Sequence, residues 1–100
     1  MYEAKIHDHV LLIRGIGELT HAELSGIAGL AWRARADNQM VVIDLARVTH
    51  LHYAGATLLK AIPGLRAAGA SRYVRDLVYA GGAGGFVELY GNIEEALRAA

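Results

Sequence analysis

The 100-residue chain contains no cysteine, a single proline and no net charge, because ten basic side chains balance ten acidic ones. The absence of cysteine excludes disulfides, thiolate ligands for metals and a cysteine nucleophile. Zero net charge argues against nucleic acid as the main partner. Phosphate binding needs a basic patch, and the arginines are instead scattered from Arg14 to Arg98.

Long hydrophobic segments are also missing. The uncharged stretch between Asp76 and Glu88 is interrupted by four glycines, whereas a membrane-spanning helix needs about twenty apolar residues. Near the N-terminus, the apolar run Val10–Ile13 is too short for the h-region of a signal peptide. We therefore expect a cytoplasmic protein without membrane insertion. One hundred residues suffice for one modest core but hardly for two, so residues 1–100 are predicted to form a single domain.

Hydrophobic periodicity predicts an α/β fold, with a mixed, largely parallel β-sheet and helices packed on it. Alternating or continuous apolar runs predict five strands: Tyr2–Ile6, Val10–Ile16, Met40–Leu45, Tyr73–Ala80 and Phe86–Tyr90. Helical spacing predicts three helices, over residues 21–36, 53–68 and 93–99. The predicted order of elements is β-β-α-β-α-β-β-α.

Local signals refine the helices. Thr20 and Glu23 have the spacing of a capping box, in which each side chain bonds the other residue's backbone amide. Pro63 lacks an amide hydrogen and therefore predicts a kink inside the second helix. Asn92 is a suitable cap for the last helix. Trp32 lies beside the apolar stripe of the first helix and is expected in the core.

Four landmarks, in order along nearly the whole chain, resemble a STAS domain. This is the fold shared by the C-terminal domains of sulfate transporters and by bacterial anti-sigma-factor antagonists. The landmarks are Gly17-Glu18-Leu19-Thr20, Val41-Val42-Ile43-Asp44-Leu45 with Val48 and Leu51, Gly55 with Leu58 and Leu59, and Ile93-Glu94-Glu95-Ala96-Leu97. The resemblance implies a non-enzymatic protein–protein interaction module in a bacterial regulatory or signalling assembly. Its implied partner is an anti-sigma or kinase-like protein, or further STAS domains.

The loop before the second helix departs from the pattern of this family. Phospho-regulated antagonists carry Asp-Ser-Ser-Gly or a close variant there, and a partner kinase phosphorylates a hydroxyl. The matching residues here are His52, Tyr53, Ala54 and Gly55. Ala54 stands at the usual acceptor position and has no hydroxyl, so the resemblance implies that the phosphorylation switch is absent at this site.

The same loop is where the resemblance implies contact with partners. An aromatic side chain such as Tyr53 is a good interface anchor, and a histidine beside it gives an interface pH sensitivity. The predicted partner-binding residues are Thr49, His52, Tyr53, Ala54, Gly55, Thr57 and Leu58. Without the acceptor hydroxyl, binding is expected to be constitutive or controlled through the partner.

A second departure concerns the helix that the family places after its fourth strand. Between Ala80 and Phe86 the chain has five residues, four of them glycine, which is too short and too flexible for two helical turns. The usual third helix is therefore predicted to be shortened or missing. Apolar sheet surface left uncovered by its loss would favour a partner or a homo-oligomer.

Two interpretations from another functional class stay open. The glycine loop at residues 81–85 follows a predicted strand, as a phosphate cradle does, but lacks the Lys-Ser/Thr of a P-loop. The pairs His7/His9 and His50/His52 offer imidazoles to a metal ion without a well-placed third ligand. Within the STAS fold, the alternative is a small subunit of a transport complex.

Enzymatic activity is not predicted. Ser25 and Ser71 are the only serines, and neither belongs to an evident nucleophile–base pair. Asp44, at the end of a predicted central strand, is expected to satisfy nearby backbone amides rather than to act as a catalytic acid. No cofactor and no metal site are predicted.

Overall fold

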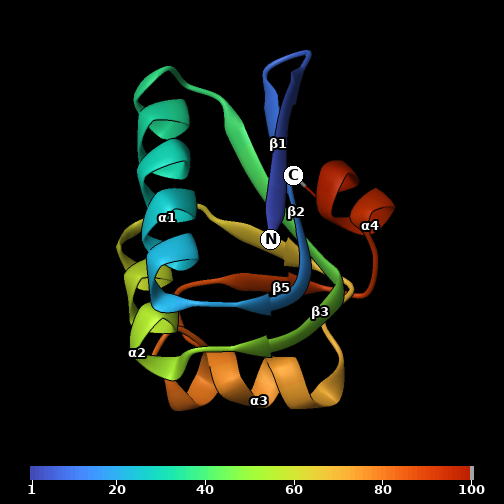
Figure 1. Ribbon diagram of the computed structural model, residues 1–100. Helices are drawn as coiled ribbons and strands as arrows, with labels where there is room; N and C mark the ends of the chain where they lie inside the picture. Colours follow the sequence, from blue (N-terminus) through green and yellow to red (C-terminus); the bar gives the residue numbers. More distant parts are fainter. Residues whose placement is uncertain (100) are drawn as a thin grey trace.

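The longest strand, β3 (Met40–Leu51), occupies the middle of a five-stranded sheet in the computed structural model (Figure 1). The sheet order follows the sequence: β1 (Tyr2–His7), β2 (Val10–Leu19), β3, β4 (Arg66–Ala68) and β5 (Glu88–Tyr90). β1 pairs antiparallel with β2, and all other pairs are parallel. The structure describes residues 1–99, except for the side chain of Tyr53.

Helices cover both faces of this sheet. They are α1 (His21–Ala36), α2 (Tyr53–Ala56) with the 3₁₀ helix η1 (Thr57–Ala61) directly after it, α3 (Arg72–Ala80) and α4 (Ile93–Arg98). Side chains of α1, η1 and α3 share the larger apolar cluster, whereas α4 packs alone on the other face, with Ala96 against Val42 and Ala68. Figure 1 shows α4 set apart from the other helices. Within residues 1–99, no helix has the length and apolarity needed to cross a bilayer.

Up to the start of β3, the order of the elements follows the prediction. Asp8 and His9 close the β1–β2 hairpin with φ angles of 47° and 66°, which suit the two-residue turns that match strand twist. The capping box is also confirmed. The Thr20 hydroxyl accepts a hydrogen bond from the Glu23 amide at 3.2 Å, and the Glu23 carboxylate accepts one from the Thr20 amide at 3.2 Å.

The Glu23 carboxylate also holds the amino terminus through an ion pair with the Met1 ammonium. The hydrogen bond from this ammonium, followed by the one from the Thr20 amide, keeps the pKa of Glu23 below its usual value. Because the folded-state pKa is the lower one, the interaction stabilises the fold at neutral pH. The contribution is lost as the pH falls through the folded-state pKa.

The prediction of one kinked helix over residues 53–68 is wrong. Helical structure ends at Ala61, Gly64 turns the chain with a φ of 68°, and β4 begins at Arg66. Pro63 therefore lies in a turn rather than inside a helix, because its ring and missing amide oppose continuation. β4 has only three residues, too few for a period-2 pattern to reveal it.

The predicted strand Tyr73–Ala80 and the missing third helix are also wrong. This segment belongs to α3, which Ser71 caps by accepting a hydrogen bond from the Val74 amide at 3.2 Å. Val74 and Val78 lie one helical turn apart and are both buried. A helix is therefore present directly before the glycine loop.

The glycine loop consequently joins α3 to β5 instead of following a strand. Gly81 ends the helix and Gly82 adopts a φ of 83°. Ala83, in the middle of the loop, is fully buried. The loop thus lacks the preceding strand on which the phosphate-cradle interpretation depended. The last strand is shorter than predicted, and α4 begins after Asn92, as expected.

Removing the cap of α1 tests the assignment of its first turn. We expect Thr20→Ala to lower the free energy of unfolding by about 1 kcal/mol, because the amide of Glu23 loses its acceptor. Thr20→Ser keeps the hydroxyl and is expected to stay within a few tenths of a kcal/mol of wild type. Urea unfolding followed by circular dichroism measures both. Equal stability of the two variants would contradict the capping role.

Candidate functional site

The predicted partner-binding residues lie where β3 ends and α2 begins. Thr49 is exposed on β3, His52 is exposed just after it, and Ala54 is half-buried in the first turn of α2. Tyr53 begins α2, but its side chain lies outside the part of the chain that the structure describes. The expected loop is therefore partly strand, because β3 extends six residues beyond the predicted end at Leu45.

Two of the predicted residues shape the backbone of this site. Gly55 is buried where α2 approaches α1, and an added Cβ would lie 2.7 Å from Leu24 Cδ1 and 3.2 Å from His21 Cα. Only glycine permits this approach without displacement of a neighbour. The Thr57 hydroxyl donates a hydrogen bond to the Ala54 carbonyl at 2.7 Å, which closes the junction between α2 and η1.

Leu58 extends the site toward α1. Its half-buried side chain lines a hollow of about 300 Å³ between α1 and η1. The other lining residues are Ala28, Gly29, Trp32, Ala61 and Ile62. Every one of these residues is apolar, so the hollow offers a surface that water solvates poorly.

The prediction that Trp32 lies in the core is wrong, because 58% of its surface is exposed. The buried stripe of α1 consists instead of Leu24, Ile27, Ala31 and Ala34. Trp32 follows Ala31 by one position and is therefore turned about 100° away from the stripe. On its other side, Trp32 lines a second hollow with Arg35, Ala36 and Pro63.

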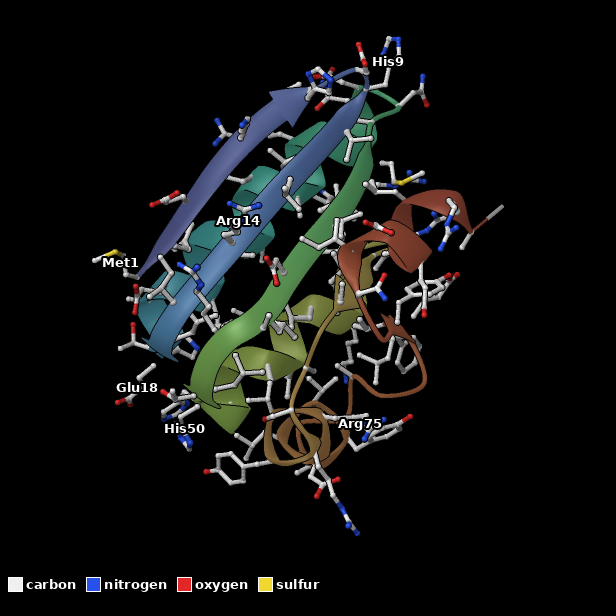
Figure 2. All side chains as sticks on the ribbon, turned by 90° about the vertical axis from the view of Figure 1, so that its right-hand side faces the viewer. Met1, His9, Arg14, Glu18, His50 and Arg75 are labelled. Atoms are coloured by element: carbon white, nitrogen blue, oxygen red, sulfur yellow. The ribbon has the colours of Figure 1, made fainter. Side chains whose placement is uncertain are left out.

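The histidines do not gather into a metal site. His50 Nδ1 lies 2.7 Å from the Tyr73 hydroxyl, with the two rings stacked, whereas the His52 ring meets His21 edge-on at a centroid distance of 6.1 Å. Figure 2 shows His9 and His50 at opposite ends of the sheet. Within residues 1–99, excepting the Tyr53 side chain, no three His, Asp or Glu side chains are placed to hold a metal ion.

Asp44 has the structural role that the sequence indicates. One carboxylate oxygen accepts a hydrogen bond from the Ala46 amide at 3.0 Å, and the other lies 3.4 Å from Arg14 Nε. Asp44 lies within β3 rather than at its end, and it faces the side of the sheet opposite α1.

Alanine substitutions at two glycines separate packing from helix propensity. We expect Gly55→Ala to lower stability by about 1–3 kcal/mol, because Leu24 and the α1 backbone leave no room for a methyl group. Gly29→Ala, at an α1 position with nothing within 4 Å of the added Cβ, is expected to raise stability by up to about 1 kcal/mol. Chemical denaturation measures both, and the same sign for the two changes would refute this packing.

Comparisons with known proteins find likeness in structure but not in sequence. No protein-family model matches the chain, and no curated protein matches it. An anti-sigma factor antagonist from Mycobacterium paratuberculosis matches with a TM-score of 0.75 and 23% identity, over 97% of this chain and 90% of that one.

Two forms of the anti-sigma factor antagonist SpoIIAA are similar as well. The unphosphorylated form matches with a TM-score of 0.73 and 19% identity, over 97% of this chain and 93% of that one. The phosphorylated form from Bacillus matches with a TM-score of 0.66 and 18% identity, over 97% and 96%. The chain therefore has the fold of the anti-sigma factor antagonists, and the STAS-like α/β architecture predicted from its sequence is confirmed.

Proposed function

We propose that this STAS-like chain is a non-enzymatic protein-interaction module in a bacterial, cytoplasmic regulatory assembly. Its partner is an anti-sigma or kinase-like protein, or another STAS domain. The observation that carries the proposal is the exposed Trp32 beside an apolar hollow, which Leu58 of η1 also lines. The resemblance to anti-sigma factor antagonists supports this class of partner.

The proposed binding face combines the two regions. One region is the predicted set Thr49, His52, Tyr53, Ala54, Gly55, Thr57 and Leu58. The other region is the apolar hollow beside Trp32, which Leu58 also lines. Tryptophan and tyrosine dominate the energetics of protein interfaces, since each buries a large area at a low cost in side-chain entropy. A partner helix or loop that covers the hollow would desolvate Trp32 and Leu58 together.

Control by phosphate at the usual position is not part of this function. The compared antagonist SpoIIAA exists in phosphorylated and unphosphorylated forms. In this chain Ala54 offers no hydroxyl, and the nearby Thr57 hydroxyl is engaged with the Ala54 carbonyl. Binding is therefore constitutive, or it is regulated on the partner.

Truncation of the aromatic anchors tests the binding face. Tagged wild type and variants are used to capture proteins from the native host, and captured proteins are quantified by mass spectrometry. We expect Trp32→Ala and Tyr53→Ala each to weaken capture of an anti-sigma, kinase-like or STAS protein by about thirtyfold, equivalent to about 2 kcal/mol. Phe86→Ala is the matched control, because Phe86 is 60% exposed but lies in the loop before β5.

Loss of capture with Phe86→Ala but not with Trp32→Ala would move the interface away from α1 and η1. Capture of a transporter ATPase by the wild type would favour the alternative of a transport-complex subunit.

Restoring a hydroxyl or adding charge at Ala54 tests the missing switch. We expect Ala54→Glu to abolish capture, because a carboxylate in the half-buried first turn of α2 must be desolvated against the partner. Ala54→Ser is expected to bind normally until a cognate kinase phosphorylates it. Wild type incubated with the same kinase is expected to gain no phosphate in residues 49–58. Phosphate on Thr49 or Thr57 of the wild type would overturn constitutive binding.

A further inference from the structure

The outer edge of β1 carries backbone groups that no other strand pairs. β1 is the first strand of the sheet order, and in Figure 2 it borders the sheet with no element beyond it. Met1 exchanges both backbone hydrogen bonds with Ile16 of β2. In an antiparallel ladder this bonding alternates along the strand. Glu3, Lys5 and His7 therefore bond β2 in the same way, and the amides and carbonyls of Tyr2, Ala4 and Ile6 point outward.

This edge lacks two of the features that usually prevent strands from pairing with another chain, a bulge and a proline. β1 pairs with β2 through six consecutive residues without a bulge, and it contains no proline. Ile6 is 61% exposed on the face that carries α1. The charged residues on β1 are Glu3 and Lys5, and neither forms an ion pair within the described part of the chain.

The sequence of β1 is complementary to itself when two copies run antiparallel. A two-fold axis through Ala4 places Glu3 of each copy directly opposite Lys5 of the other. It also places Tyr2 opposite Ile6 on the other face. The outward amides and carbonyls of Tyr2, Ala4 and Ile6 then meet the same groups of the second copy. The register centred on Ala4 thus pairs the outward backbone groups, the opposite charges and the apolar side chains at the same time.

The registers centred on Glu3 or Lys5 also bring outward backbone groups together, but they are worse in charge and in apolar contact. Moving the axis to Glu3 brings the two Glu3 carboxylates face to face, and moving it to Lys5 brings the two Lys5 ammonium groups together. Both shifts also pair fewer of the outward amides and carbonyls. Like charges directly opposite each other destabilise a strand pair, so the charges select the register centred on Ala4.

We propose that two copies of this chain associate through antiparallel pairing of their β1 strands, which joins the two sheets into one of ten strands. The association is isologous and therefore closes at the dimer. It goes beyond the proposed partner binding, because no residue of β1 lines the hollow beside Trp32. A six-residue strand pair is a small interface, so the dimer is weak, with a Kd on the order of micromolar.

Sedimentation equilibrium of the tag-free chain tests for the dimer. From about 1 µM to 1 mM, the average mass is expected to rise from 10.7 kDa toward twice that value. Ala4→Pro removes an outward amide while leaving the bonds between β1 and β2 intact, and it is expected to keep the chain monomeric. Circular dichroism establishes that the variant is folded. A wild type that stays monomeric up to about 1 mM overturns the proposal.

Charge exchange tests the register. Lys5→Glu and Glu3→Lys each place like charges opposite one another, and each is expected to raise the Kd of self-association at least about tenfold. An equimolar mixture of these two variants is expected to form a heterodimer, and the double variant Glu3→Lys/Lys5→Glu to dimerise like the wild type. Dimers that tolerate each single reversal would use another surface and would refute β1 pairing.

These variants also distinguish the two proposals. Tyr53→Ala and Trp32→Ala are expected to leave the β1 dimer unchanged, and Lys5→Glu is expected to leave capture of the partner protein unchanged.

Discussion

Burial of three consecutive branched side chains in β3 is the constraint on which the rest of the fold depends. Val41, Val42 and Ile43 are all buried, with Val42 in the smaller apolar cluster and its neighbours in the larger one. Successive residues of a strand face opposite sides of the sheet, so both faces must be covered. α1, η1 and α3 cover one face, and the six-residue α4 covers the other around Ala96.

The sequence is informative wherever an element is long enough to show its period. Apolar runs or a capping residue place β2, α1, α4 and the start of β3 within a few residues, whereas β3 ends six residues later than predicted. Between Tyr53 and Ala80, by contrast, the chain forms short elements joined by abrupt turns. Apolar residues from η1 and β4 therefore merge into one apparent helical pattern. The turn at Gly64 separates η1 from β4, and the cap at Ser71 marks the start of α3. The surrounding composition obscures both of these local signals.

The binding face is less predictable than the fold. Whether a helical side chain is exposed depends on its direction around the helix axis relative to the core, which the sequence does not specify. Trp32 differs from buried Ala31 by one position, and an error of that size moves a side chain from core to surface. Gly55 was associated with the site by resemblance alone. Its physical role, close contact with Leu24 and the α1 backbone, follows only from the three-dimensional packing of α2 against α1. By contrast, the sequence alone shows which functional groups the loop carries, including the missing hydroxyl at Ala54.

The two-residue turn at Asp8 and His9 has a consequence for how the chain folds. Among the strand pairs of residues 1–99, β1–β2 is the one joined by a tight turn, whereas the pairing of Val10 with Met40 must close a loop that contains all of α1. Closing a long loop costs more entropy and takes longer than forming a hairpin, which needs only microseconds. The hairpin at the N-terminus is therefore the part of the sheet that can form first, during synthesis, before the strand that will pair with its inner edge exists. The parallel pairs then raise the contact order and set the folding rate.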